Sequence, residues 1–209
     1  MLYSSETQKW KIQGSARSSW PADLDYKHGV YCNGGIHWIR DRDDQLSRYD
    51  IDKDFPRLVS NPSGHGLMHE RKFRYFGESR GHLQLIDIYK SCVTEFDVME
   101  MGKDDSGWFV KYHVDLNPIG TVFPEVVCDH LHLAIYDCYS CCVLFLAREE
   151  TEENSSILLH IPMGIISYNV SDKTVKKLND LIPKGSETMG SLQPGWGDAC
   201  PHIATLARV

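Results

Sequence analysis

The chain has 209 residues, a length that suits one ordinary domain or a piece of a larger one. It carries 22 Lys and Arg residues against 29 Asp and Glu residues, and this net charge of −7 argues against nucleic acid as the main partner. With 42% hydrophobic residues the chain can build a core, which excludes disorder throughout. Seven Cys is an odd number without regular spacing, so we expect reduced thiols rather than a disulfide framework.

The sequence offers no route into or across a membrane. The opening residues, Met1 to Glu6, lack the basic and then apolar segments of a secretion signal. The longest strongly apolar stretch, 141–147, is far shorter than the roughly 20 residues that a spanning helix needs. We therefore expect a soluble protein of the cytoplasm, the nucleus or both, with no membrane partner.

Alternating apolar and polar residues predict β-strands along the chain. Tyr3 and Trp10 lie on either side of a turn at 6–9, and later runs at 82–88, 108–116 and 130–135 alternate clearly. Aromatic and β-branched residues fill these runs, while Gly, Pro, Asn, Asp and Ser lie between them. The one candidate for a helix, 173–181, fits either period. We predict an all-β chain.

A repeat with an offset of 47 residues supports this fold class. The matching pairs are Gly34 with Gly81, Ile36 with Leu83, Trp38 with Leu85, Tyr49 with Phe96 and Ile51 with Val98. Tyr3 lies 46 residues before Tyr49, and a later copy at 164–171 resembles the unit that begins at Tyr49. That copy lies 72 residues beyond Phe96, so we expect a longer intervening loop that includes the acidic stretch 148–156.

A period near 47 suits the four-stranded blade of a β-propeller, and a β-sandwich with chance similarity between strands is the alternative. Each blade would use the glycine pair for a tight turn and would bury an aromatic ring between neighbouring sheets. Dividing 209 residues by 47 gives about 4.4 blades, at the low end for closed propellers. We predict a propeller of about four blades that is incomplete.

Several segments resemble the C-terminal, F-box-associated kelch-like propeller of plant F-box proteins. These segments are 3–10, 30–39, 76–83, 98–101, 106–112, 164–168 and 202–209, and they occur in the order found in that family. The resemblance covers nearly the whole chain, so we treat residues 1–209 as one such domain. The repeats are degenerate, because Trp10 follows Tyr3 by seven residues whereas Pro56 has that place after Tyr49.

The resemblance implies a protein-binding role without catalysis or cofactor. Full-length relatives look like substrate receptors of SCF-type E3 ubiquitin ligases, in which an F-box binds a Skp-type adaptor and the propeller binds a target protein. No segment of this chain resembles an F-box or the first blades of the family. We therefore expect the chain to bind a target but not the adaptor. The alternative is a kelch-type interaction module with no ligase role.

A weaker alternative is a hydrolase that uses Ser79. The stretch 77–81 matches the G-x-S-x-G pattern of a nucleophile elbow. That elbow needs a helix after the serine, whereas the residues after Gly81 alternate as a strand. The repeat also accounts for Gly81 without catalysis.

Cysteine and histidine side chains cluster in the later part of the chain. They are Cys128, His130, His132, Cys138, Cys141 and Cys142. Four of them could hold zinc in a tetrahedron, but their spacing matches no common zinc module, so we predict no metal site. Buried strand residues are the simpler interpretation.

Loops carry the remaining candidates. The stretch 183–201 is rich in Gly, Ser and Pro, and its Met189 and Trp196 are our candidate protein-binding residues, because binding residues concentrate on loops and Trp is a frequent anchor. A plain connection before the last strand is the alternative. The sequons that begin at Asn154 and Asn169 are interpreted as turns.

Overall fold

The computed structural model describes residues 2–5, 7–11, 24–59, 71–89, 94–123, 142–149, 151, 155–161 and 164–179. The prediction of an all-β chain is confirmed for this part, which contains fourteen strands and one four-residue α-helix. The runs predicted at 82–88 and 108–116 fall on strands β8 and β10. The run at 130–135 lies outside the described residues.

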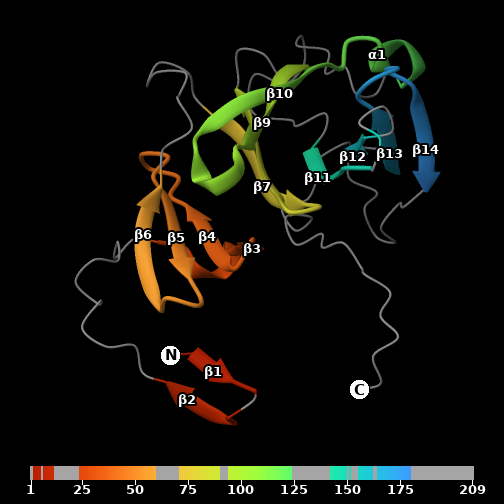
Figure 1. Cartoon of the computed structure of the whole chain (residues 1–209). Helices are drawn as coiled ribbons and strands as arrows, with labels where there is room; N and C mark the ends of the chain where they lie inside the picture. The colour runs from red at the N-terminus through yellow and green to blue at the C-terminus, as the bar shows by residue number, and fades with distance from the viewer. Residues whose placement is uncertain are drawn as a thin grey trace, which may run out of the picture.

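The strands form three four-stranded antiparallel sheets and one hairpin (Figure 1). Sheet 1 contains β3 (Val30–Cys32), β4 (Gly35–Ile39), β5 (Leu46–Asp50) and β6 (Phe55–Val59). Sheet 2 contains β7 (Arg71–Ser79), β8 (His82–Tyr89), β9 (Glu95–Met101) and β10 (Trp108–Asp115). Sheet 3 contains β11 (Cys142–Ala147), β12 (Ser156–Ile161), β13 (Gly164–Asn169) and β14 (Val175–Asn179). The hairpin contains β1 (Leu2–Ser4) and β2 (Lys9–Lys11).

Each sheet is a meander in which neighbours along the chain are neighbours in the sheet. Between sheets, the closest approaches of strands are those of β3 with β7 and of β7 with β11. The first strand of each sheet therefore lies against the first strand of the next, as Figure 1 shows at the centre of the molecule. The β1–β2 hairpin lies apart from these sheets in the same view.

Tight turns explain how the first two strands of sheets 1 and 2 pair. Asn33 and Gly34 join β3 to β4 with φ of 46° and 74°, and Arg80 and Gly81 join β7 to β8 with φ of 53° and 77°. Two successive positive φ values are typical of the turn that best fits the twist of a two-residue hairpin. The offset of 47 residues is confirmed at this turn.

The same offset is wrong for the third strand. His37 pairs with Arg48 across β4 and β5, whereas Gln84 pairs with Glu100 across β8 and β9. The second strands therefore differ by 47 residues and the third strands by 52, because strands β8 and β9 are longer than β4 and β5. In register Tyr49 corresponds to Met101 rather than to Phe96.

The most regular repeat is the hairpin between the third and fourth strands. Its cross-strand pairs are Tyr3–Trp10, Tyr49–Pro56, Met101–Trp108 and Tyr168–Val175, each seven residues apart. The prediction that the unit at 164–171 repeats the one at Tyr49 is confirmed, and the connection 148–155 supplies part of the longer loop. Tyr49 and Tyr168 are 3% and 1% exposed, whereas Tyr3 is 50% exposed.

The helix considered for 173–181 is wrong, because Val175–Asn179 forms strand β14. Val175 packs against the core while Lys176 and Lys177 are exposed, an arrangement that an edge strand accommodates. The described α-helix, α1 (Ile119–Val122), follows β10 and buries Ile119. The Asn169 sequon is confirmed as a turn, since its Oδ1 accepts the backbone N–H groups of Ser171 and Asp172.

Two interfaces join the three sheets, and we call them the first seam (sheets 1 and 2) and the second seam (sheets 2 and 3). The buried apolar side chains of the first seam are Cys32, Leu46, Val59, Leu83 and Met101. The second seam has a larger core of fourteen such side chains, including Ile86, Val98, Ile157 and Leu159. A third cluster, Leu24, Trp38 and Tyr49, lies on the other face of sheet 1.

Candidate functional site

The structure tests only some of the residues that the sequence singled out. Met189 and Trp196 lie outside the described residues, as does most of the Cys/His cluster. Within the described part, no group of three His, Cys, Asp or Glu side chains could hold a metal ion. Cys142 and Cys32 lie on strands, and burial raises the pKa of each thiol to about 11, so both are protonated at neutral pH.

Ser79 does not lie on a nucleophile elbow. It ends β7, and the residues after the turn form strand β8 rather than a helix. The Ser79 side chain is 7% exposed, and its Oγ accepts the backbone N–H of Arg148 at 3.0 Å. The hydroxyl therefore joins sheet 2 to the chain just after β11.

The first seam carries a charged cluster at the end where β5 turns into β6. Arg48 and Arg57 are cross-strand neighbours on β5 and β6, and both donate to the carboxylate of Asp105 from the β9–β10 hairpin of sheet 2. The Arg48 Nη1–Asp105 Oδ2 distance is 2.6 Å. The Arg48 and Asp105 side chains are 13% and 10% exposed, whereas that of Arg57 is 44% exposed. The cluster thus faces solvent through Arg57.

His37 lies beneath this cluster. It is 1% exposed, and its Nε2 is 3.9 Å from Asp105 Oδ1. Its ring interacts with the backbone of Val30, but neither ring nitrogen makes a hydrogen bond of good geometry within the described part of the protein. Burial lowers the pKa of His37 to about 4, so the ring is neutral at physiological pH.

Local backbone features position Arg48 and Asp105. Gly35 makes room for Arg48, because a Cβ at Gly35 would lie 2.4 Å from Arg48 Nε. Asp104 and Asp105 both have left-handed backbone conformations, with φ of 60° and 57°. Among the described residues, the loops β5–β6 and β13–β14 have one left-handed residue each, Asp54 and Lys173, and Gln8 has the same place in the β1–β2 loop.

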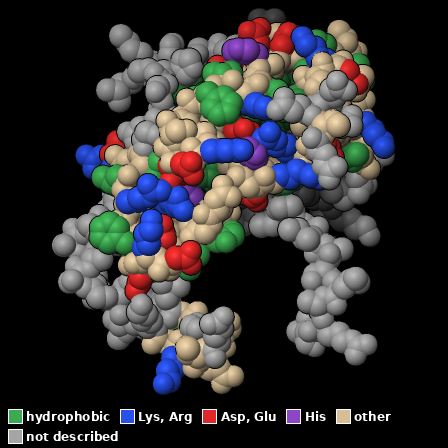
Figure 2. Space-filling view, viewed as in Figure 1, with side chains coloured by type: hydrophobic (Ala, Val, Ile, Leu, Met, Phe, Trp, Pro, Cys, Tyr) green, Lys and Arg blue, Asp and Glu red, His purple; other side chains and the backbone are tan. Residues whose placement is uncertain are grey.

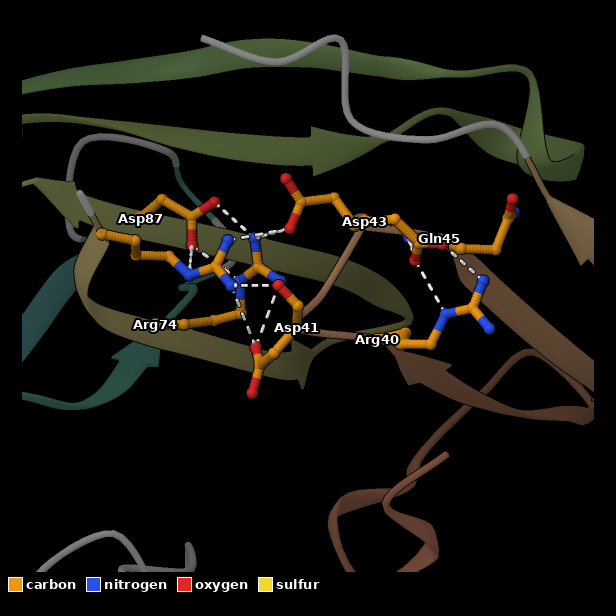
Figure 3. Close-up of polar contacts among 8 residues, drawn as sticks. Arg40, Asp41, Asp43, Gln45, Arg74 and Asp87 are labelled. Carbon is orange, nitrogen blue, oxygen red and sulfur yellow. Dashed lines mark hydrogen bonds and ion pairs between the residues drawn. The ribbon is translucent and has the colours of Figure 1, made fainter. Parts of the chain in front are cut away.

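A second cluster closes the opposite end of the first seam (Figure 3). Arg74 of β7 donates to Asp87 of β8 and to Asp44 of the β4–β5 loop, at 2.6–2.7 Å. Arg71 donates to Asp44 at 2.8 Å and also contacts Asp41. Two arginines of sheet 2 thus hold a loop of sheet 1, which gives this cluster a structural role.

Among the described residues, the second seam carries one charged cluster, at the same end as Asp105. Glu100 of β9 is 3% exposed and accepts a hydrogen bond from Arg148 Nη1 at 2.7 Å. His82 Nδ1 lies 3.2 Å from the other oxygen of this carboxylate. Tyr75 contributes a further contact, since its hydroxyl accepts the backbone N–H of Leu146.

On the face shown in Figure 2, the described residues form no patch of a single charge. Figure 2 shows basic and acidic side chains interspersed over sheets 1 and 2. Exposed apolar side chains near the hairpin end of these sheets are Ile51, Phe55 and Phe109, which are 40%, 58% and 45% exposed. Mixed charge with exposed aromatic rings is compatible with a protein partner.

Sequence reasoning missed the two arginines and Asp105. Arg48 and Asp105 are 57 residues apart and belong to different sheets. Their meeting depends on how the sheets pack, which no spacing in the sequence reports. The only usable signal was the turn itself, since two successive Asp residues in a hairpin loop tolerate left-handed backbone.

The comparison with known proteins agrees with the resemblance that the sequence segments show. No protein-family model matches the chain. Over 183 residues, or 86% of the chain, the sequence is 30% identical to the F-box protein At5g07610 of Arabidopsis thaliana. The chain is therefore similar to a plant F-box protein. It spans 43% of the length of that relative. No described helix is long and apolar enough to cross a membrane.

Proposed function

We propose that the chain belongs to the plant F-box protein family and is the substrate-recognition part of an SCF-type ubiquitin ligase. The observation that carries this proposal is the 30% identity to a plant F-box protein over 86% of the chain. Because the chain spans 43% of that relative, the ligase role depends on an F-box that this sequence does not display. In this proposal the chain binds a target protein, and the F-box binds the Skp-type adaptor.

We further propose that residues 1–209 are a kelch-like β-propeller domain. Three observations support it: successive four-stranded meanders, first strands that contact one another, and a third-to-fourth-strand hairpin that recurs with one spacing. The β1–β2 hairpin would then be the outer half of a further blade, giving about four blades in an incomplete propeller. A crystal structure in which the sheets stack without an axis would contradict this fold.

The proposed role needs neither covalent chemistry nor a cofactor. A rigid set of sheets presents loops to a target, and specificity lies in the side chains of those loops. Met189 and Trp196 remain our candidates for contacts with the target. The proposed locations are the cytoplasm and the nucleus, which a fluorescent fusion in plant cells would test.

The function can be tested with two versions of the chain, one as given and one with the F-box segment of a characterised F-box protein fused in front. In a pull-down with purified Skp-type adaptor, only the fusion should bind. In plant cells the fusion should lower the abundance of a target protein, and a proteasome inhibitor should prevent this loss. The unfused chain should raise the abundance of the same protein by competition.

Each arm has an outcome that contradicts the proposal. Tight binding of the adaptor by the unfused chain would show that the adaptor contact lies in this domain. A fusion that binds the adaptor but changes the abundance of no protein would favour the kelch-type module without a ligase role. The control is a fusion whose F-box carries substitutions that abolish adaptor binding.

A further inference from the structure

The register of sheet 1 forces two arginines together. Arg48 and Arg57 are directly opposite each other on β5 and β6, so their side chains leave the same face of the sheet. Two neighbouring guanidinium groups repel unless an anion lies between them. Their planar N–H donors match the oxygens of a carboxylate or a phosphate. In this structure the anion is the side chain of Asp105.

Asp105 does not use all the donors around it. His37 is 1% exposed, its ring interacts with the backbone of Val30 without a hydrogen bond of good geometry in the described part, and its Nε2 is 3.9 Å from the carboxylate. Arg48 Nε is also buried without a hydrogen bond in the described part. Buried polar groups are normally satisfied, so a polar site that its occupant fills incompletely is unusual.

The backbone that delivers Asp105 is strained. Asp104 and Asp105 are consecutive left-handed residues, a conformation that is unfavourable for residues other than Gly. The fully described loops β5–β6 and β13–β14 avoid this arrangement and have a single left-handed residue at their end. Such strain persists only where contacts hold it, and here the contacts are those of Asp105 with the arginines.

Solvent reaches the site from one side. Arg57 is 44% exposed at its side chain, and Phe55, two residues earlier on the same face of β6, is 58% exposed. An acidic side chain that approaches from solvent would meet the guanidinium of Arg57 beside an aromatic ring. Arg and aromatic residues are the side chains most enriched among interface anchors.

We propose that Arg48 and Arg57 form a recognition site for an acidic side chain of a protein partner, and that Asp105 occupies this site in the unbound protein. Binding exchanges one carboxylate for another: Asp105 leaves, the loop 103–106 relaxes, and the oxyanion of the partner bridges the two arginines. The partner in this proposal is the target protein, so to that extent it rests on the proposed function. The oxyanion site itself can be tested without a target.

The first test uses the unmodified chain and two small probes, sodium succinate and sodium phosphate, at constant ionic strength set with sodium chloride. Hydrogen exchange followed by mass spectrometry should show faster exchange at 102–107 as the probe concentration rises, because the backbone N–H of Ser106 bonds to Lys103 O in the closed loop. Exchange in the hairpin 170–173 should stay constant. Unchanged exchange at 102–107 up to saturating probe would show that Asp105 is a permanent structural partner and would overturn the proposal.

The second test is Asp105→Asn, measured by titration calorimetry with the same probes. If Asp105 occupies the site in at least nine molecules of ten, its removal should tighten binding by about tenfold or more. Asp97→Asn is the matched control, because Asp97 pairs with exposed His113 in another part of sheet 2. Equal affinity of the two variants would contradict the proposal, as would binding that persists when Arg57→Gln is added to Asp105→Asn.

Two further outcomes are separable. Stronger binding of succinate than of phosphate would identify an Asp or Glu side chain as the natural ligand, whereas the reverse order would identify a phosphorylated residue and overturn the acidic side chain. If Asp105→Asn is too unstable for calorimetry, the exchange experiment on the unmodified chain still decides the question. Neither result depends on the adaptor, so a failed ligase role and a failed oxyanion site are distinguishable.

Discussion

Each of the two seams has an arginine–carboxylate ion pair at the same end of the molecule. The earlier sheet supplies the arginine at the first seam and the carboxylate at the second. Arg48 and Glu100 occupy corresponding positions, since one pairs with His37 and the other with Gln84, 47 residues later. At the first seam sheet 1 supplies the cation and sheet 2 the carboxylate of Asp105. At the second seam sheet 2 supplies the carboxylate and Arg148 the cation.

This reversal would disfavour other pairings of the sheets. If sheet 1 packed against sheet 3 in the same geometry, Arg48 would face Arg148. If two copies of sheet 2 packed together, Glu100 of one would face Asp105 of the other. Like charges in a desolvated contact cost several kcal/mol, so the charges select the order of sheets whose strands otherwise look alike.

The seams also differ in what stabilises them. The first seam combines a small apolar cluster with charged clusters at both ends, whereas the second combines a large apolar core with one charged cluster. Apolar burial contributes in proportion to area, whereas ion pairs depend on salt and on geometry. The first seam should therefore be the one that responds to charge substitutions.

Reversal of a charge at the first seam should have the largest effect. Arg48→Glu places a second carboxylate beside Asp105, and we expect a loss of at least about 4 kcal/mol in the free energy of unfolding. Urea denaturation followed by circular dichroism would measure it. Lys53→Glu, at an 80% exposed side chain, is the control and should change little. Adding Asp105→Lys to Arg48→Glu should recover part of the loss; no recovery would argue against the pairing.

At the second seam the largest effect should come from apolar truncation. Leu159 of β12 is 0% exposed within the core, and Leu159→Ala should cost about 3 kcal/mol by loss of burial and creation of a cavity. Leu178→Ala, at a 47% exposed position of β14, should stay within about 0.5 kcal/mol of the unmodified chain. Equal costs at the two positions would refute the assignment of this seam as the main core.

A smaller effect should follow from filling the space over Gly35. Gly35→Ala places a Cβ against Arg48 and should cost about 2 kcal/mol, because a well-packed contact tolerates little added volume. If Arg48 is the neighbour that suffers, Gly35→Ala should cost almost nothing in a chain that already carries Arg48→Ala. This double-mutant cycle isolates the contact. Additive costs would show that the backbone, rather than Arg48, resists the substitution.

The smallest effect is expected on the pH dependence of unfolding and comes from His37. Its counterpart in sheet 2 is Gln84, which does not titrate. Burial lowers the pKa of His37 from 6.5 to about 4, so between these values the unfolded chain binds more protons than the folded one. Its contribution is complete above pH 6.5 and is lost as the pH falls toward 4, by about 1–2 kcal/mol at pH 5. His37→Gln should flatten the pH dependence of unfolding over this range. An unchanged pH profile in His37→Gln would show that other groups set it.

Local pattern predicted the elements better than their register. Alternation in 82–88 and 108–116 identified β8 and β10, and the glycines at 34 and 81 identified equivalent turns. Phe96 was matched to Tyr49 because both are aromatic, although the greater length of strands β8 and β9 shifts the third strand by five residues. Two neighbouring strands can lengthen together without altering the alternation in either, so sequence alone does not fix which residues of the two strands pair.

The polar cluster was beyond prediction for a different reason. A charged residue on an alternating strand is expected on the solvent side, and nothing local marks Arg48 or Glu100 as buried. Their partners come from the next sheet, so the burial appears only once the sheets are packed. Met189 and Trp196, chosen as loop residues, remain untested predictions.

The recurrent hairpin with its seven-residue spacing has a consequence for how the chain folds. In the described sheets, every pair of neighbouring strands is consecutive along the chain. Each meander can therefore form before distant segments of the chain are available. Hairpins form in about 1–10 μs, much faster than a ribosome adds a residue at about 5–20 per second. Each sheet can thus be complete before the next one emerges. The slow step is then the docking of finished sheets at the seams, where the reversed charges make only one order stable.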